Sequence, residues 1–174
     1  MTFAFSLGLV SSVIAGCISL ITLLNAHRSV IRWSFGVGMA LLGFESFCTG
    51  FAVHELLPAR VIDWERLAFV PTCLLPGVWL VFSLSYGRGH YRDVLGKWRV
   101  CVFAFFALPV TLAVLFRESF LSAVAQPDGR WSLRLGLAGF ALNLFVLLTS
   151  VLVLMNLENT FRASVGMMRW RIKS

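Results

Sequence analysis

The sequence contains few charged side chains and no long polar segment. Only 13% of its residues are Asp, Glu, Lys or Arg, whereas 59% are hydrophobic. A soluble domain of 174 residues needs a much more polar surface than this composition can supply. We therefore expect a single membrane domain, and the length leaves almost no room for a soluble catalytic domain.

Motifs for metal binding and for catalysis are also missing. The four cysteines form no CxxC pair and have no His/Cys ligand spacing; they are Cys17, Cys48, Cys73 and Cys101. We found no nucleophile motif, no phosphate-binding loop and no pair of catalytic carboxylates. We therefore expect no metal, no other cofactor and no catalytic residue in this chain.

The chain is basic, with a net charge of +7, but the position of the charges argues against nucleic acid as a partner. The Lys and Arg residues flank hydrophobic runs. Contact with anionic lipid headgroups and control of membrane topology explain such residues better than nucleic-acid binding does. The expected partner is therefore the lipid bilayer.

Five apolar runs are long enough to cross a bilayer. The central run, 67–86, holds twenty residues without a charged side chain, which is about 30 Å of helix at ~1.5 Å per residue. No run shows the alternation of a barrel strand. The sequence predicts an all-α, polytopic membrane helix bundle with spans near 3–24, 33–53, 67–86, 100–116 and 135–157.

The connections between the spans set the expected orientation. Ten Lys and Arg residues fall on one side of the predicted bundle and five on the other. The positive-inside rule places the richer side in the cytoplasm, with the N-terminus outside and the C-terminal tail, 158–174, inside. On the outer side, the connection 117–134 is polar, and Gln126-Pro127-Asp128-Gly129 predicts a turn within it.

Glu45 is the one ionisable residue deep inside a predicted span. A charge at that depth costs about 2.5–3.5 kcal/mol, so this carboxyl must be protonated, paired or next to water. Asn143 lies at a matching depth, eight residues inside the outer end of its own span, or about 12 Å. The two could share a hydrogen bond. A structural contact between helices and a role in sensing a ligand both remain open for Glu45.

Two prolines, Pro71 and Pro76, lie within the third predicted span. Each removes a backbone hydrogen bond, so together they predict a kink in the outer half of that helix. A kink opens space for a ligand pocket or a hinge, although kinks without function are common in membrane helices. Cys48 and Cys73 lie at similar depths in the second and third spans and could be neighbours, as small apolar core residues.

The tail carries a helical stripe at steps of three and four residues: Leu154, Leu157, Phe161, Val165, Met168 and Ile172. The fifth helix could therefore continue into the cytoplasm. Alternatively, Ser164-Val165-Gly166 could break it and lead toward a further span. An amphipathic segment at the membrane surface is a third possibility.

Two segments of the sequence resemble a known family. Asn156-Leu157-Glu158-Asn159-Thr160-Phe161-Arg162, followed by Arg169-Trp170-Arg171-Ile172-Lys173, resembles the end of the membrane region of PrsK-type sensor histidine kinases. These kinases accompany exosortase and PEP-CTERM sorting systems in Gram-negative bacteria. Phe82-Ser83-Leu84-Ser85-Tyr86-Gly87-Arg88 also resembles the end of a span in multi-span kinase sensor regions.

The resemblance implies a signal-input domain in the bacterial inner membrane that forms a homodimer and acts on a cytoplasmic kinase core in cis. The chain has no phospho-acceptor histidine box and no ATP-binding boxes, so kinase activity would belong to residues outside it. In this interpretation Glu45, Asn143, Pro71 and Pro76 are candidates for sensing, whereas the output residues are Glu158, Arg162, Arg169, Trp170 and Arg171. A small transporter or a structural subunit of a membrane complex is the alternative.

Overall fold

A computed structural model describes residues 2–25, 29–55, 57–86, 91–116, 120–125 and 131–171, with side chains at 3–25, 29–55, 57–86, 93–116, 120 and 134–162. These residues form five helices and one two-stranded antiparallel sheet. In chain order the elements are α1 (Thr2–Leu24), α2 (Val30–His54), α3 (Pro58–Ser85), α4 (Tyr91–Leu115), β1 (Leu121–Ala125), β2 (Trp131–Leu135) and α5 (Leu137–Arg171).

Each of the five helices is long and apolar enough to cross a membrane, which confirms the expected helical, multi-pass architecture. The predicted spans fall on these helices apart from one or two terminal residues. The helices extend further than the apolar runs, however. Helix α3 begins at Pro58, nine residues before its predicted span, because proline is well suited to the first turn of a helix.

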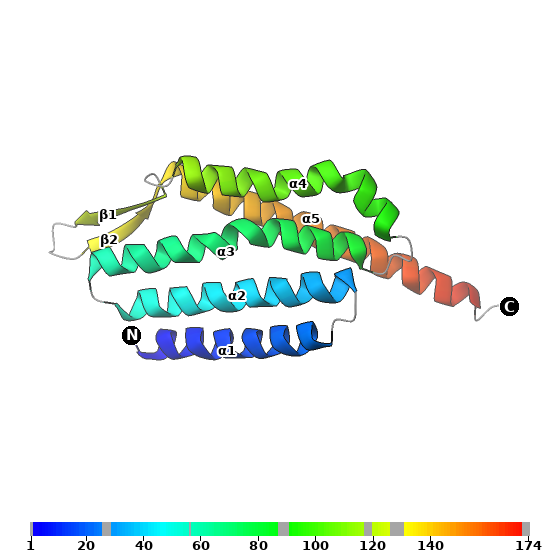
Figure 1. Cartoon of the computed structure of the whole chain (residues 1–174), viewed down its shortest axis with the longest axis horizontal. Coiled ribbons are helices and arrows are strands. Elements are labelled where there is room, and N and C mark those ends of the chain that lie inside the picture. The colour runs from blue at the N-terminus through cyan, green and yellow to red at the C-terminus, as the bar shows by residue number, and fades with distance from the viewer. Residues whose placement is uncertain are drawn as a thin grey trace.

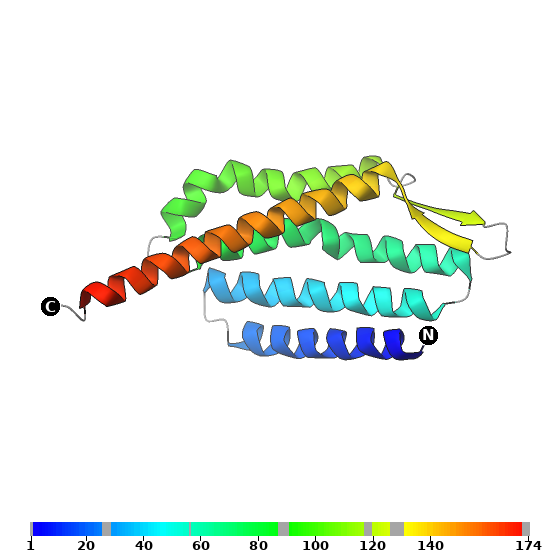
Figure 2. The same cartoon turned by 180° about the vertical axis from the view of Figure 1, so that it is seen from behind.

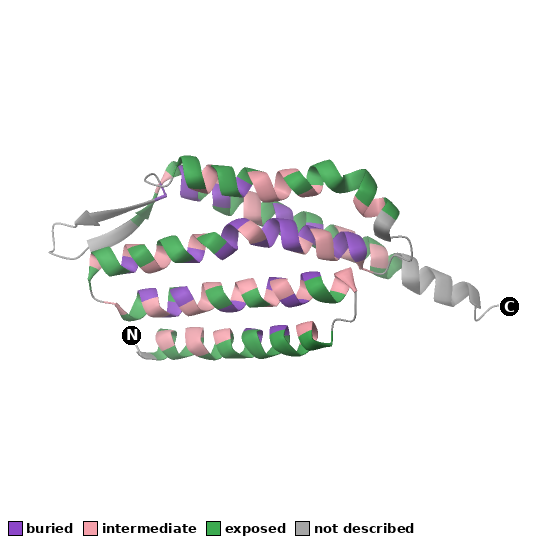
Figure 3. Ribbon diagram, in the orientation of Figure 1, coloured by how far each residue is buried: buried purple, intermediate pink, exposed green. Residues whose placement is uncertain are grey.

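Helix α3 is central to the bundle. Helices α1, α2 and α3 lie side by side in one layer, and α4 and α5 cover the other side of α3 (Figures 1 and 2). Burial follows this arrangement (Figure 3). More than half of the most apolar window of α3 is buried, at 56%, against 11% in α1 and 6% in α4. The central helix therefore contacts α2, α4 and α5, whereas α1 packs against α2.

Small residues hold α1 closely against α2. A Cβ atom added at Gly8 would lie 2.9 Å from the Cα atom of Gly50, so only glycine fits there. Ser19 donates from Oγ to the backbone carbonyl of Gly36 on α2 at 2.8 Å. Close backbone approach gives van der Waals contact, the main attraction between helices in lipid. The α1–α2 pair is therefore a tightly packed helical hairpin.

A compact apolar cluster joins α3 to α4 and α5. Its buried members are Cys73, Phe120, Ala138 and Leu142, and the Phe69 ring packs 4.9 Å from that of Phe120. The Phe120 carbonyl also accepts a hydrogen bond from the backbone N–H of Gly136 at 2.9 Å. Phe120 therefore connects the beginning of α5 to the centre of the bundle.

The connection between α4 and α5 contains a β-hairpin, which the sequence analysis did not predict. Strands β1 and β2 pair antiparallel, from Leu121 opposite Leu135 to Ala125 opposite Trp131. The alternation of apolar Trp131, Leu133 and Leu135 with polar Ser132 and Arg134 is the signal that was overlooked. The predicted turn, 126–129, lies between the strands but outside the described residues.

Helix α5 is continuous to Arg171. Of the alternatives for the tail, the structure therefore favours continuation of the helix over a break at Ser164-Val165-Gly166. The end of α5 and the beginning of α1 lie at opposite ends of the bundle (Figure 2).

Candidate functional site

The side chain of Glu45 contacts Thr72, across the interface between α2 and α3. The Thr72 hydroxyl lies 3.2 Å from Glu45 Oε1 and 2.8 Å from the backbone carbonyl oxygen of Ala68, one turn earlier in α3. Glu45 is half-buried and Thr72 is buried. This contact is a polar link between α2 and α3.

The two contacts of Thr72 make this link responsive to a proton. A hydroxyl has one hydrogen to donate and two lone pairs to accept with. When that hydrogen is donated to Ala68, the contact with Glu45 needs a proton on the Glu45 carboxyl. When Glu45 is ionised, the Thr72 hydroxyl must donate to the carboxylate instead. The arrangement can therefore exchange two hydrogen-bond patterns without moving either helix far.

Aromatic side chains pack along the α2–α3 interface on both sides of the Glu45–Thr72 contact, about two helical turns away from it. On one side, the Phe51 ring stacks 5.1 Å from the ring of Trp64. On the other, the Trp79 ring lies 6.1 Å from that of Phe35 and 5.6 Å from that of Phe82. Aromatic pairs of this kind add about 0.5–1.5 kcal/mol each beyond the area that they bury. The polar contact is therefore held in a defined, mostly apolar setting.

Glu65 adds a second carboxyl to this interface. It precedes Thr72 by seven residues, which is two helical turns, so both belong to the same face of α3. Glu65 is close enough to feel the charge of Glu45, and both carboxyls act on Cys48. The sequence analysis assigned Glu65 to a loop, because the beginning of α3 was placed too late. The site therefore has two carboxyls, not one.

Pro71 and Pro76 are both buried within α3, on either side of Thr72. Helix α3 nevertheless continues from Pro58 to Ser85. Each proline leaves the carbonyl four residues earlier without its helical N–H partner, which affects Leu67 and Thr72. The segment of α3 next to Glu45 therefore contains two carbonyls without helical N–H partners, and the kink expected there stays a prediction.

Asn143 is not brought to Glu45. Its Nδ2 atom donates to the backbone carbonyl of Gly139 in its own helix at 3.1 Å, and its side chain is exposed. Helix α3 lies between α2 and α5, so equal depth in the membrane does not bring these residues together. The expected Glu45–Asn143 hydrogen bond is replaced by the Glu45–Thr72 contact.

A second polar contact links α3 to α5 near the other end of α3. Asn156 donates from Nδ2 to the backbone carbonyl of Ser83 at 2.8 Å, although 73 residues separate them in sequence. The rings of Tyr86 and Phe161 lie 5.8 Å apart just beyond it. These residues belong to the segments 82–88 and 156–162, which the sequence analysis singled out. The fold therefore brings both segments into contact, which the sequence alone did not reveal.

The proposed output residues extend from this junction. Glu158 and Arg162 form an exposed ion pair one turn apart, with Arg162 Nη2 at 2.6 Å from Glu158 Oε1. Arg169, Trp170 and Arg171 belong to the end of α5, and their side chains lie outside the described residues. An exposed pair of this kind adds about 0.3–0.5 kcal/mol to helix stability.

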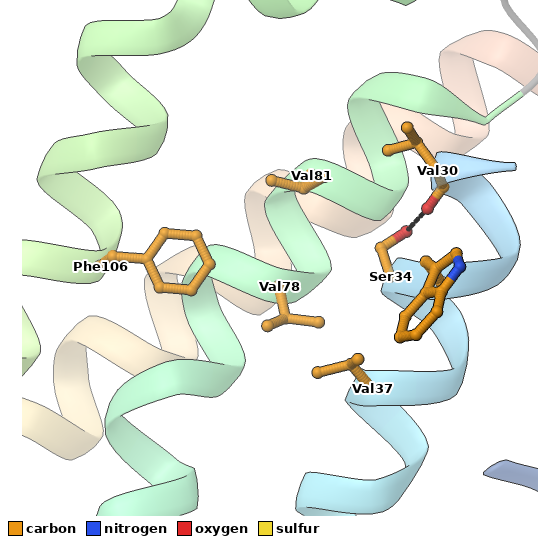
Figure 4. Close-up of a pocket in the computed structure, with 7 residues that line it drawn as sticks. Val30, Ser34, Val37, Val78, Val81 and Phe106 are labelled. Atoms are coloured by element: carbon orange, nitrogen blue, oxygen red, sulfur yellow. Dashed lines mark hydrogen bonds between the residues drawn. The ribbon is translucent and has the colours of Figure 1, made fainter. Parts of the chain in front are cut away.

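Two cavities border the α2–α3 interface. One, of about 340 Å³, lies between α2, α3 and α4. Phe106 of α4 points toward Val78 and Val81 of α3, and Val37 of α2 lies on the other side of Val78 (Figure 4). Its polar lining residue, Ser34, donates to the Val30 carbonyl at 2.8 Å. The other, of about 440 Å³, is lined by Arg32, Tyr86 and Phe161 among others. The first offers shape but no free polar group for recognition.

The four cysteines form no disulfide, and the two buried ones have different surroundings. Cys48 on α2 is fully buried and close to Glu45 and Glu65, whereas Cys73 belongs to the apolar cluster with Phe120. Among the described residues, no three His, Cys, Asp or Glu side chains are grouped as metal ligands would be. Cys48 and Cys73 are therefore packed as small apolar core residues, whereas Cys17 and Cys101 are exposed.

Comparisons with known proteins do not assign the chain. No family model, no curated protein and no solved structure matches it. A function must therefore be argued from the residues and from their arrangement in the bundle.

Proposed function

We propose that this chain is the membrane-embedded signal-input domain of a sensor histidine kinase of the PrsK type, in a bacterial inner membrane. The observation that carries the proposal is the position of α3. It makes the Glu45–Thr72 contact with α2 and, eleven residues later, the Ser83–Asn156 contact with α5. One helix thus joins a candidate sensing contact to a candidate output helix.

The path from input to output needs only small movements. About 16 Å of helix separates Thr72 from Ser83 at ~1.5 Å per residue. A signal that changes the hydrogen bonds of Thr72 would shift or rotate α3 near its prolines, each of which removes one backbone hydrogen bond. Asn156 would pass that shift to α5. A ligand or membrane state drives this change only if it prefers one of the two arrangements.

The output end of the domain is α5, which continues for fifteen residues beyond Asn156. With the N-terminus outside, this end enters the cytoplasm, in agreement with the Lys and Arg distribution. A homodimer would place two α5 helices beside each other and pass the shift to a kinase core in cis.

A structural subunit of a membrane complex is the second candidate, and the exposure of α4 favours it. Only 6% of the most apolar window of α4 is buried. A helix of this kind has a large surface left for neighbouring membrane proteins or lipid. Such a subunit would co-purify with membrane partners and would need no kinase core.

The reading frame beyond Ser174 separates the two candidates. The sensor proposal expects further sequence with a phospho-acceptor histidine and ATP-binding boxes. Autophosphorylation of that complete protein in liposomes should then change when Glu45 is replaced by Gln, while membrane insertion stays normal. Replacement of exposed Asn159 by Gln is the matched control. A stop codon after Ser174, or unchanged output in the Glu45→Gln variant, would overturn the sensor proposal.

A further inference from the structure

A third cavity, larger than the two at the α2–α3 interface, is a groove between α3 and α4. It has a volume of about 720 Å³, which is within the range of sites that hold drug-sized ligands. Its walls come from the first half of α3 and the last turns of α4, with Cys73 and Phe120 among the lining residues. Val70 and Val114 on its sides are 57% and 71% exposed, so the groove opens toward the lipid.

Two charges of opposite sign lie at one end of this apolar groove. Asp63 and Arg66 line it, both are exposed, and both belong to the first turns of α3, near the end of the bundle. They are three residues apart and therefore neighbours on the helix surface. No ion pair between them occurs within 4.0 Å, in the part of the chain that the structure describes. Both charges are thus available to a ligand.

We propose that this groove binds a phospholipid with an ammonium headgroup, with one acyl chain along the apolar walls. The phosphate binds Arg66, because a guanidinium matches phosphate oxygens with two parallel hydrogen bonds. The ammonium binds Asp63. A purely anionic headgroup would satisfy Arg66 but would face the carboxylate of Asp63. Phosphatidylethanolamine fits best, because its primary ammonium donates hydrogen bonds, whereas a choline headgroup has no N–H.

This inference concerns a ligand site and does not depend on the signalling role. It uses different residues from the Glu45–Thr72 contact, on a different face of α3. A failed kinase proposal would therefore leave the groove and its charges unchanged, and the lipid measurement can be made on the purified protein alone.

The test is native mass spectrometry of the purified protein, titrated in detergent with phosphatidylethanolamine, phosphatidylcholine or phosphatidylglycerol. We expect one phosphatidylethanolamine to bind about fivefold more tightly than either other lipid, as suits a partly exposed pair of ionic contacts. Arg66→Gln should weaken binding of phosphatidylethanolamine and of phosphatidylglycerol. Asp63→Asn should remove the preference between these two lipids. Ala113→Trp, which fills the groove, should remove the site.

Arg60→Gln is the matched control. Arg60 is an exposed arginine on the same helix, but it pairs with Glu55, at 3.6 Å between Nη1 and Oε1, and does not line the groove. Equal binding of the three lipids to the unaltered protein would overturn the proposal. An equal effect of Arg60→Gln and Arg66→Gln would also overturn it. If Ala113→Trp prevents folding, Asp63→Asn at its exposed position still decides the outcome.

Discussion

Asn156 on α5 donates a hydrogen bond to the backbone carbonyl of Ser83 on α3, with 2.8 Å between Nδ2 and O. The acceptor is a main-chain atom close to the end of α3. A change in the position of the α3 backbone therefore acts on α5 through one side chain only, that of Asn156. This bond and the Tyr86–Phe161 contact form one junction, which we treat as the link between the central helix and the tail.

Replacing Asn156 with Leu should weaken this junction. The carbonyl of Ser83 would lose a donor in an apolar setting, at a cost of about 0.5–1.5 kcal/mol in the free energy of unfolding. Unfolding in mixed detergent, followed by circular dichroism, measures this change. The control is Asn159→Leu, on an exposed position one turn later. Equal stability of the Asn156→Leu variant and the unaltered protein would contradict the assigned contact.

The Glu45–Thr72 contact should be visible as coupling between the two residues. We expect the effects of Glu45→Ala and Thr72→Val on stability to be non-additive by about 0.5–1.5 kcal/mol, as for other hydrogen bonds between membrane helices. Thr72→Ser keeps the hydroxyl and should behave like the unaltered protein in the same double-mutant cycle. Additive effects of the first two replacements would show that the side chains do not interact.

Gly8→Ala should destabilise the α1–α2 pair. The new methyl group would lie 2.9 Å from the Cα atom of Gly50, so the backbones must separate, which typically costs about 1–3 kcal/mol. Gly16 on the same helix has nothing within 4 Å of a new Cβ atom, and alanine is the better helix former. Gly16→Ala should therefore be neutral or stabilising. Thermal unfolding of the two variants tests this difference, and equal effects would argue against the packing of α1.

Gly77→Ala should disturb the contact between α3 and α4. A Cβ atom there would lie 2.6 Å from the Phe106 ring, which must then move. We expect a loss of about 1–3 kcal/mol in stability. Phe106→Leu in the same chain should restore part of this loss, because the smaller side chain leaves room. Gly96→Ala on α4, where a Cβ atom meets nothing within 4 Å, is the control. Absence of any rescue by Phe106→Leu would show that the two positions are not in contact.

The helical architecture was predictable because long apolar runs can satisfy their backbone in lipid only as helices. The predicted spans also assigned Glu45 to the second helix and both prolines to the third, where the structure has them. Helix ends were less predictable. Amphipathic turns such as 58–66 extend beyond the apolar run and contain charges that resemble a loop. For this reason Glu65 was not recognised as part of the α2–α3 interface.

Contacts between helices were beyond the sequence analysis. Depth in the membrane follows from counting residues, but the facing partner depends on which helices are adjacent. Glu45 and Asn143 have similar depth, yet α3 lies between their helices, and Thr72 takes the expected role of Asn143. The Ser83–Asn156 bond was missed for the same reason, since 73 residues separate the partners.

The connection of Phe120 to the beginning of α5 has a mechanical consequence. The buried Phe120 ring and its bond to Gly136 hold one end of this helix, while the other end extends away from the bundle. From Ala138 to Arg171 the helix is about 50 Å long, so a tilt of about 5° at the held end displaces the far end by roughly 4 Å. A movement of about 2 Å at Asn156, roughly 27 Å from the held end, would thus grow to about 4 Å at Arg171, as along a lever arm.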